Sequence, residues 1–118
     1  MGQLTTHVLD TAHGCPAAGL AVSLWRVGDD GSLSPLGCFA LDTDGRAGAP
    51  LLSGAALVPG RYRMLFEVGA YFRGRGTALS DPPFLDVVPV DFGIADTQAH
   101  YHVPLLVSPW SYGTYRGS

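Results

Sequence analysis

Short runs in which apolar and polar residues alternate, separated by glycine and proline, constrain the fold of this chain more than any other feature. In residues 4–10 (LTTHVLD), His7 falls on the face opposite to Leu4 and Val8. A repeat of two residues is the period of a β-strand with one buried face. Related runs occupy residues 19–28, 36–46, 60–69, 83–94, 99–108 and 111–118. Because turn-forming residues separate them, the pattern predicts an all-β, two-sheet β-sandwich of seven to eight strands.

One segment is a candidate helix, and one strand has a restricted position. Residues 70–80 (AYFRGRGTALS) contain Gly74 and Gly76, and each glycine costs a helix about 1 kcal/mol relative to alanine. We therefore expect a single short helix of one or two turns.

The run 83–94 contains Pro89, which cannot donate a ladder hydrogen bond. This predicts an edge strand or a bulge. With 118 residues, the chain is expected to form one domain spanning 1–118.

Composition and charge exclude several classes of partner. Charged residues make up only 14% of the chain, less than a small domain usually needs to remain soluble alone, so another copy is expected to cover part of its surface. A net charge of −3 without a basic stripe argues against nucleic acid, and no apolar run is long enough to span a membrane. Cys15 and Cys38 are expected to be free thiols, and the absence of a signal-peptide pattern predicts a cytoplasmic protein.

Histidines stand at strand positions where apolar residues or threonine would be usual. His100 and His102 are two residues apart, so they point to the same side, about 6.5–7 Å apart along the strand. This spacing is compatible with a metal site, an acid–base pair or an ordinary surface. His7 could supply a third zinc ligand, and Asp96 could orient one of the rings.

Other polar residues leave similar alternatives. Arg46 closes the run LDTDGR, where it is either a turn residue facing solvent or a clamp for an anion or enolate. His13 and Cys15 in TAHGCP are interpreted as turn residues rather than as a thiolate–imidazole pair. The sequence lacks the phosphate-binding, nucleophile-elbow, metalloprotease and dinucleotide-binding motifs.

Four stretches taken together carry a family resemblance: LTTHVLD with the following GCPA, then DTDGR, HYHVPLLVSP and YRGS. In this order the chain resembles the transthyretin-like 5-hydroxyisourate hydrolases, enzymes of urate degradation that act after urate oxidase. The resemblance covers essentially the whole chain. Transthyretin, the hormone carrier with the same fold, lacks the histidines and the YRGS ending. Trp110 departs from the tyrosine or phenylalanine more usual in the family, and is expected to alter the shape of a channel rather than the chemistry.

The resemblance implies a transthyretin-like sandwich that assembles as a homotetramer, a dimer of dimers, with active sites in the channel where dimers meet. It implies hydrolysis of 5-hydroxyisourate to 2-oxo-4-hydroxy-4-carboxy-5-ureidoimidazoline, without a metal or other cofactor. The residues that match the family's catalytic positions are His7, Arg46, His102 and Ser118. Those that match its substrate-binding positions are Arg46, Tyr115, Arg116 and Gly117.

Such a reaction needs a base for water, donors for a developing oxyanion and an anchor for the heterocycle. We expect His7 and His102 to share water activation and proton return, while Arg46 binds the substrate and stabilises charge. Tyr115 and Ser118 would orient the histidines or the substrate. Two alternatives remain: a small-molecule carrier without catalysis, and a zinc hydrolase with histidine ligands.

Overall fold

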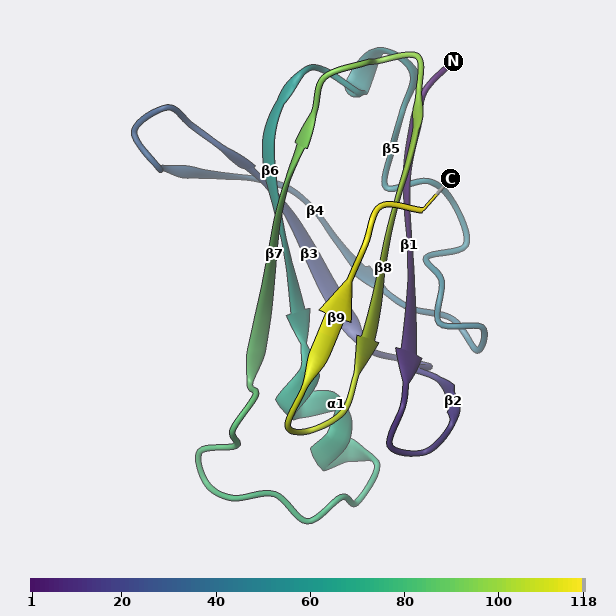
Figure 1. Ribbon diagram of the computed structural model, residues 1–118, viewed down its shortest axis with the longest axis vertical. Coiled ribbons are helices and arrows are strands. Elements are labelled where there is room, and N and C mark those ends of the chain that lie inside the picture. Colours follow the sequence, from purple (N-terminus) through teal and green to yellow (C-terminus); the bar gives the residue numbers. More distant parts are fainter. Residues whose placement is uncertain (118) are drawn as a thin grey trace.

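Two layers of β-strands and one short helix make up the fold in a computed structural model that describes residues 1–117 (Figure 1). The elements are β1 (Gln3–Asp10), β2 (Cys15–Pro16), β3 (Ala21–Val27), β4 (Leu33–Ala40), β5 (Leu52–Ser53), a 3-10 turn (Gly54–Ala56), β6 (Gly60–Glu67), α1 (Val68–Gly74), β7 (Val87–Ile94), β8 (His100–Val107) and β9 (Tyr112–Thr114).

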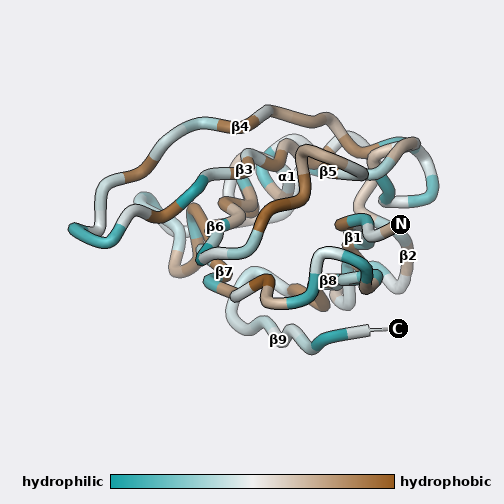
Figure 2. The backbone as a smooth tube through the Cα atoms, turned by 90° about the horizontal axis from the view of Figure 1, so that it is seen from above, coloured by the Kyte–Doolittle hydropathy of each residue, from teal (hydrophilic) through white to brown (hydrophobic). Residues whose placement is uncertain are grey.

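The strands form two sheets. One has the order β2-β1-β8-β9, with β5 also paired to β1, and the other has the order β4-β3-β6-β7. Figure 2 shows β3 and β4 on one side of the molecule and β8 and β9 on the other. The predicted two-sheet β-sandwich with one short helix is confirmed.

The inward faces of both sheets meet in one apolar core. Side chains alternate between buried and partly buried along β1 and β6, as a strand period of two requires. The largest fully buried side chains include Tyr62, Phe66, Leu4 and Leu105, which come from both sheets. Because every second residue of these strands is committed to the core, the residues between them are left for the outer faces.

The pairing of β1 with β8 joins the beginning of the chain to its end. These strands run parallel over eight registered residue pairs, from Gln3 opposite His100 to Asp10 opposite Val107. Every other strand pair in residues 1–117 is antiparallel. The parallel pairing brings the predicted strands 4–10 and 99–108 side by side (Figure 1).

Several predicted boundaries need correction. The helix begins at Val68, two residues before the expected start, and ends at Gly74, giving the expected one or two turns. It does not continue towards residue 80, because Gly76 adopts a φ of +77°, which breaks a right-handed helix. The strand at 36–46 runs instead from Leu33 to Ala40. The last strand stops at Thr114 instead of continuing to 118.

Other expectations about the elements hold. β7 lies at the edge of its sheet, as Pro89 predicted. Cys15 and Cys38 are both free thiols. The two-residue strands β2 and β5 were not predicted. Within residues 1–117 no helix is long and apolar enough to cross a membrane.

Candidate active site

The outer face of β1 and β8 gathers three histidines. The parallel register places Thr5 opposite His102 and His7 opposite Pro104. Thr5, His7 and His102 are partly buried, and His100 is exposed. Since paired strands lie about 4.8 Å apart, outward side chains at successive register positions form one continuous patch. The structure thus brings His7 and His102 onto the same patch, with His100 beside them.

The hydroxyl of Thr5 connects two of these imidazoles. Thr5 Oγ1 lies 2.8 Å from His100 Nε2 and 2.8 Å from His102 Nδ1. The ring centroids of His100 and His102 are 6.2 Å apart, so the hydroxyl bridges a separation that the rings do not close themselves. The contact at Nδ1 leaves Nε2 as the nitrogen of His102 that remains free for chemistry.

The turn that follows β4 carries Arg46 to this patch. Asp42 organises the turn, because its Oδ1 accepts hydrogen bonds from the backbone nitrogens of Asp44 and Arg46 at 2.9 and 3.1 Å. Gly45 has a φ of +73°, and a Cβ there would lie 2.5 Å from the backbone oxygen of Val8. Only glycine permits this close approach.

As a result of this approach, Arg46 forms an isolated antiparallel bridge with His7. The peptide nitrogen of Val8 donates a 2.9 Å hydrogen bond to the carbonyl of Gly45, which fixes the turn against β1. The backbone of the turn therefore places Arg46 beside His7, close enough for its charge to lower the pKa of His102.

The C-terminal segment folds back over the outside of β8 (Figure 2). The peptide nitrogen of Gly117 donates a 2.8 Å hydrogen bond to the carbonyl of His102. A Cβ at position 117 would lie 2.7 Å from His102 Cδ2 and 3.2 Å from its Cβ and Cγ. Gly117 therefore packs directly against the His102 ring and needs to be glycine to do so.

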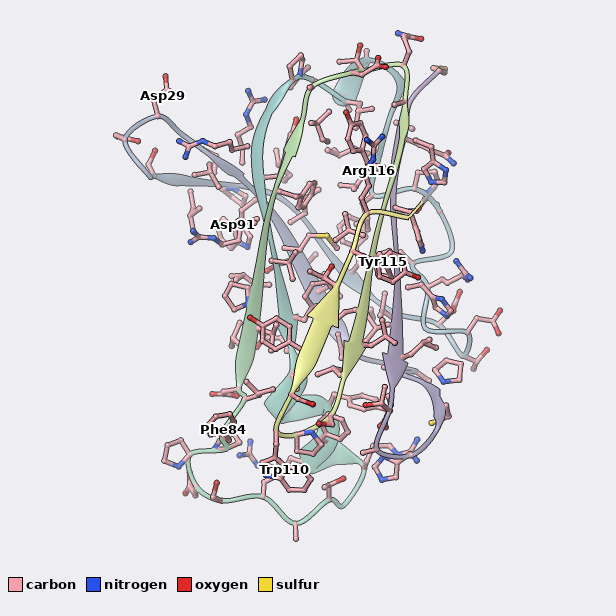
Figure 3. The ribbon with its side chains drawn as sticks, viewed as in Figure 1. Asp29, Phe84, Asp91, Trp110, Tyr115 and Arg116 are labelled. Atoms are coloured by element: carbon pink, nitrogen blue, oxygen red, sulfur yellow. The ribbon has the colours of Figure 1, made fainter. Side chains whose placement is uncertain are left out.

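The other predicted residues of the tail do not all join the patch. The Arg116 guanidinium stacks 4.2 Å from the ring centroid of Tyr101, a residue on the inward face of β8. Figure 3 shows Arg116 between β7 and β8, where it lines a pocket with Val90 and Tyr101. Tyr115 is 60% exposed. Ser118 lies outside the described residues.

The electrostatic environment keeps His102 neutral. Burial lowers its pKa, and the positive charges available on Arg46, His100 and His7 lower it further. A histidine pKa below its ordinary value of about 6.5 means that the ring is unprotonated at neutral pH. His102 is therefore in the state that can accept a proton.

A pocket of about 430 Å³ opens beside the patch, and Thr5 and Arg46 are among the residues that line it. Its size lies within the range usual for small-molecule sites. Among residues 1–117, no three histidine, cysteine, aspartate or glutamate side chains are placed to hold a metal ion. The arrangement supplies a neutral imidazole, a guanidinium and a hydroxyl, which suits proton transfer to and from a bound polar molecule.

Fold and site together define a class of protein: a two-sheet β-sandwich with an imidazole–guanidinium site on the outer face of one sheet. A family model described as the HIUase/transthyretin family matches residues 4–117. The chain belongs to this family, which confirms the resemblance carried by the four sequence stretches.

The similar proteins include 5-hydroxyisourate hydrolases and a transthyretin. The chain is 56% identical to a 5-hydroxyisourate hydrolase of Ralstonia nicotianae, with 100% of both chains aligned. It is 36% identical to the 5-hydroxyisourate hydrolase of Klebsiella pneumoniae, with 100% of both chains covered and a TM-score of 0.81. Sea bream transthyretin in complex with thyroxine is 28% identical, with 98% of this chain and 94% of that chain covered and a TM-score of 0.87.

Thr5 is the residue of the patch that sequence reasoning missed. The signal was present, because alternation in LTTHVLD puts Thr5 on the same face as His7. One suggestion was wrong. Asp96 does not hydrogen-bond to a histidine; its carboxylate accepts a hydrogen bond from the backbone of Gln98. His13 lies in a turn and interacts with Asp10 at 2.7 Å, which agrees with its interpretation as a turn residue, whereas Cys15 belongs to the short strand β2.

Proposed function

We propose that the chain hydrolyses 5-hydroxyisourate as a step of urate degradation, the activity named for its Ralstonia and Klebsiella relatives. The observation that carries the proposal is the convergence of His7, Arg46 and His102 on one patch of the β1–β8 face. Each of these side chains comes from a different part of the chain, so the fold assembles the patch and no local motif creates it.

The chemistry of the substrate fits these groups. 5-Hydroxyisourate is an oxidised purine whose six-membered ring opens when water attacks an amide-like carbonyl. A neutral His102 accepts a proton from the attacking water. The Arg46 guanidinium binds the polar heterocycle and stabilises the negative charge that develops on its oxygen. His7, next to Arg46, takes part in returning the proton to the ring nitrogen that leaves.

A carrier function is the second candidate, because transthyretin shares the fold. A carrier needs a pocket of suitable shape, but it does not need an unprotonated imidazole next to a guanidinium. The lowered pKa of His102, caused first by burial and then by Arg46, supports a role in proton transfer. Identity is also higher to the Ralstonia hydrolase than to the sea bream carrier.

We further propose that four copies assemble and that the patch faces a channel between them. Leu106 and Trp110 are 37% and 63% exposed, and Leu106 points outward from β8, on the same face as the histidines. Tyr115 and Ser118 would act on substrate in this channel, whereas Arg116 stacks on Tyr101 on the inward face of β8 and would not. The two free thiols are compatible with the reducing, cytoplasmic location that we propose.

The test is a direct assay of the substrate. Adding the protein to freshly made 5-hydroxyisourate should accelerate the decay of its ultraviolet band above the spontaneous rate. His102→Ala and Arg46→Ala should each reduce kcat/KM by roughly 10²–10⁴-fold, the contribution usual for a general base or a charge-stabilising group. Arg61→Ala is the matched control, because Arg61 lies on β6 in the opposite sheet, where it contacts the carbonyl of Gly28.

Two outcomes would contradict the proposal. A protein that binds thyroxine-like ligands but does not accelerate the decay is a carrier. Activity that disappears on chelation and returns with zinc would instead support the metal-dependent alternative.

A further inference from the structure

The proposed reaction uses His7, Arg46 and His102, but leaves the Thr5 hydroxyl and His100 without a role. Thr5 Oγ1 is within hydrogen-bond distance of one nitrogen on each ring, at 2.8 Å in both cases. A hydroxyl has a single proton to donate and can accept in return. When both rings are neutral, one imidazole therefore donates to Thr5 while the other accepts from it, so the tautomers of His100 and His102 are coupled.

The orientation of the two rings gives this chain of hydrogen bonds a direction. Thr5 contacts His102 at Nδ1, so the free nitrogen of His102 is Nε2. It contacts His100 at Nε2, so the free nitrogen of His100 is Nδ1. His102 is partly buried beneath Gly117, whereas His100 is exposed. The chain thus leads from a shielded imidazole to one that solvent can reach.

We propose that Thr5 and His100 form a proton relay that presents Nε2 of His102 as the base and carries the proton it accepts to solvent. This inference rests on the proposed hydrolysis. In the resting state His102 Nδ1–H donates to Thr5, and the Thr5 hydroxyl donates to the unprotonated Nε2 of His100. Thr5 and His100 are positioning and relay residues, and neither needs to touch the substrate.

Each proton in the relay has a defined origin and destination. The attacking water gives a proton to His102 Nε2 as its oxygen bonds to the carbonyl carbon. The Nδ1 proton of His102 then moves to Thr5 Oγ1, and the Thr5 proton moves to His100 Nε2. His100 releases its Nδ1 proton to water. One proton has entered the chain and one has left it. The chain is reset when His102 Nε2 gives its proton to the departing ring nitrogen, His100 Nδ1 takes a proton from water, and the protons between the two rings move back through Thr5.

The charges around His102 favour this transfer. An imidazolium at His102 is disfavoured by burial, by Arg46 and by His7, all of which lower its pKa. Arg46 faces His102 from the turn after β4, and His7 faces it from β1. His100 faces His102 from the same strand, β8. Moving the positive charge to the exposed His100 places it where water can solvate it.

The experiment removes the hydroxyl while keeping the shape of the side chain. Thr5→Val should lower kcat by roughly 10- to 100-fold with little change in KM, a loss of the size seen when a group that orients a functional imidazole is removed. Thr5→Ser restores a hydroxyl and should recover most of the activity. Thr11→Val is the matched control, because the Thr11 hydroxyl donates its hydrogen bond to the carbonyl of Val107 and not to a histidine.

Two further measurements separate a relay from a purely structural contribution. The dependence of kcat on the deuterium content of the solvent should be curved in the native protein, because several protons move, and linear in Thr5→Val. His100→Ala should lose activity and regain it with added imidazole, which can take the proton from Thr5. A structural role for Thr5 predicts neither effect.

The outcomes distinguish the relay from the hydrolysis on which it rests. If the native protein is active and Thr5→Val matches it in kcat, the relay is wrong and the hydrolase assignment stands. If the native protein is inactive, the hydrolase assignment fails. Nitrogen NMR of the ring atoms then still tests the coupling, which requires His102 Nδ1 and His100 Nε2 to hold one proton between them and Thr5→Val to abolish this preference. Two independently titrating rings would overturn it.

Discussion

At the scale of single residues, the contact between Gly117 and His102 gives a sharp test of the tail. A Cβ at position 117 would lie 2.7 Å from His102 Cδ2, well inside the 3.5–4.0 Å at which carbon atoms normally touch. Gly117→Ala must therefore shift either the tail or the imidazole. Since displacements near 1 Å at a reacting group can cost about 100-fold in rate, we expect kcat/KM for 5-hydroxyisourate to fall roughly 10- to 100-fold, with an unchanged melting temperature.

Gly113→Ala is the control for this substitution. Gly113 lies in β9, four residues before Gly117, and a Cβ there would meet no atom within 4 Å. It should therefore keep native activity. Equal activities of the two alanine variants would show that the packing of the tail on His102 does not matter for catalysis.

Single residues also show what alternation can and cannot predict. The outward positions of His7, His100 and His102 followed from the strand period alone, because period two leaves no other face for them. The bridge from Thr5 to His102 joins residues 97 apart in sequence, and no local pattern contains that register. The direction of Arg116 was equally inaccessible, since it depends on stacking against Tyr101 and not on a strand period.

At the scale of elements, a buried carboxylate ties α1 to the end of β1. Asp10 is 1% exposed. Its Oδ2 accepts a 2.8 Å hydrogen bond from the Tyr71 hydroxyl and contacts His13 Nδ1 at 2.7 Å, while Oδ1 accepts from the backbone nitrogens of Ala12 and His13. Burial alone would raise the pKa of Asp10, but these hydrogen bonds outweigh it and the pKa is lowered. The carboxylate is therefore stabilised in its charged form.

Tyr71→Phe should destabilise the fold in a manner that depends on pH. A carboxyl with a lowered pKa in the folded state contributes stability that is fully present above its unfolded pKa of about 3.9 and is lost as the pH falls through the folded pKa. Losing the Tyr71 hydrogen bond raises the folded pKa. The free energy of unfolding should fall by about 1–3 kcal/mol at neutral pH, and the difference from the native protein should shrink as Asp10 becomes protonated.

Urea denaturation at a series of pH values measures this difference. Ser80→Ala is the control, because it removes an exposed hydroxyl that donates to the carbonyl of Pro82, and a surface change of this kind is expected to stay within about 0.5 kcal/mol. A loss for Tyr71→Phe that is independent of pH would mean that the hydroxyl acts through packing and not through the Asp10 carboxylate.

The elements themselves were predictable to the extent that their signals were local. Alternation located six long strands, and Pro89 identified β7 as an edge strand. The strands β2 and β5 have two residues each, too few to show a period. The parallel pairing of β1 with β8 depends on the topology of the whole chain and cannot be predicted from the sequence of either strand. The family resemblance was therefore needed to predict that His7 and His102 lie in one site.

At the scale of the whole molecule, the open question is how copies of the chain assemble around the patch. The low charged fraction, 14%, predicted that another copy covers part of the surface. A contact between copies needs exposed apolar side chains, and three of them lie close together in the sequence. Leu106 is on the outer face of β8, and Trp110 and Tyr112 follow it at 63% and 44% exposure. Alternation along residues 99–108 already puts Leu106 on the same face as His102, and the fold shows that Leu106 is exposed there; that another copy covers this face stays a prediction.

Leu106→Glu tests whether assembly completes the site. A charge buried at a contact between copies without a partner is strongly unfavourable, so the variant should run as a smaller species than the native protein, which we expect at four times the 12.4 kDa of one chain. Because the histidines share this face, kcat/KM should fall with the loss of assembly.

Leu36→Glu is the control: Leu36 is 44% exposed on β4, in the other sheet, and its substitution should preserve both mass and activity. Light scattering coupled to gel filtration, followed by assay of the separated species, decides the matter. A Leu106→Glu monomer with native activity would mean that one chain holds a complete site, and a native protein that is itself monomeric would rule out the tetramer.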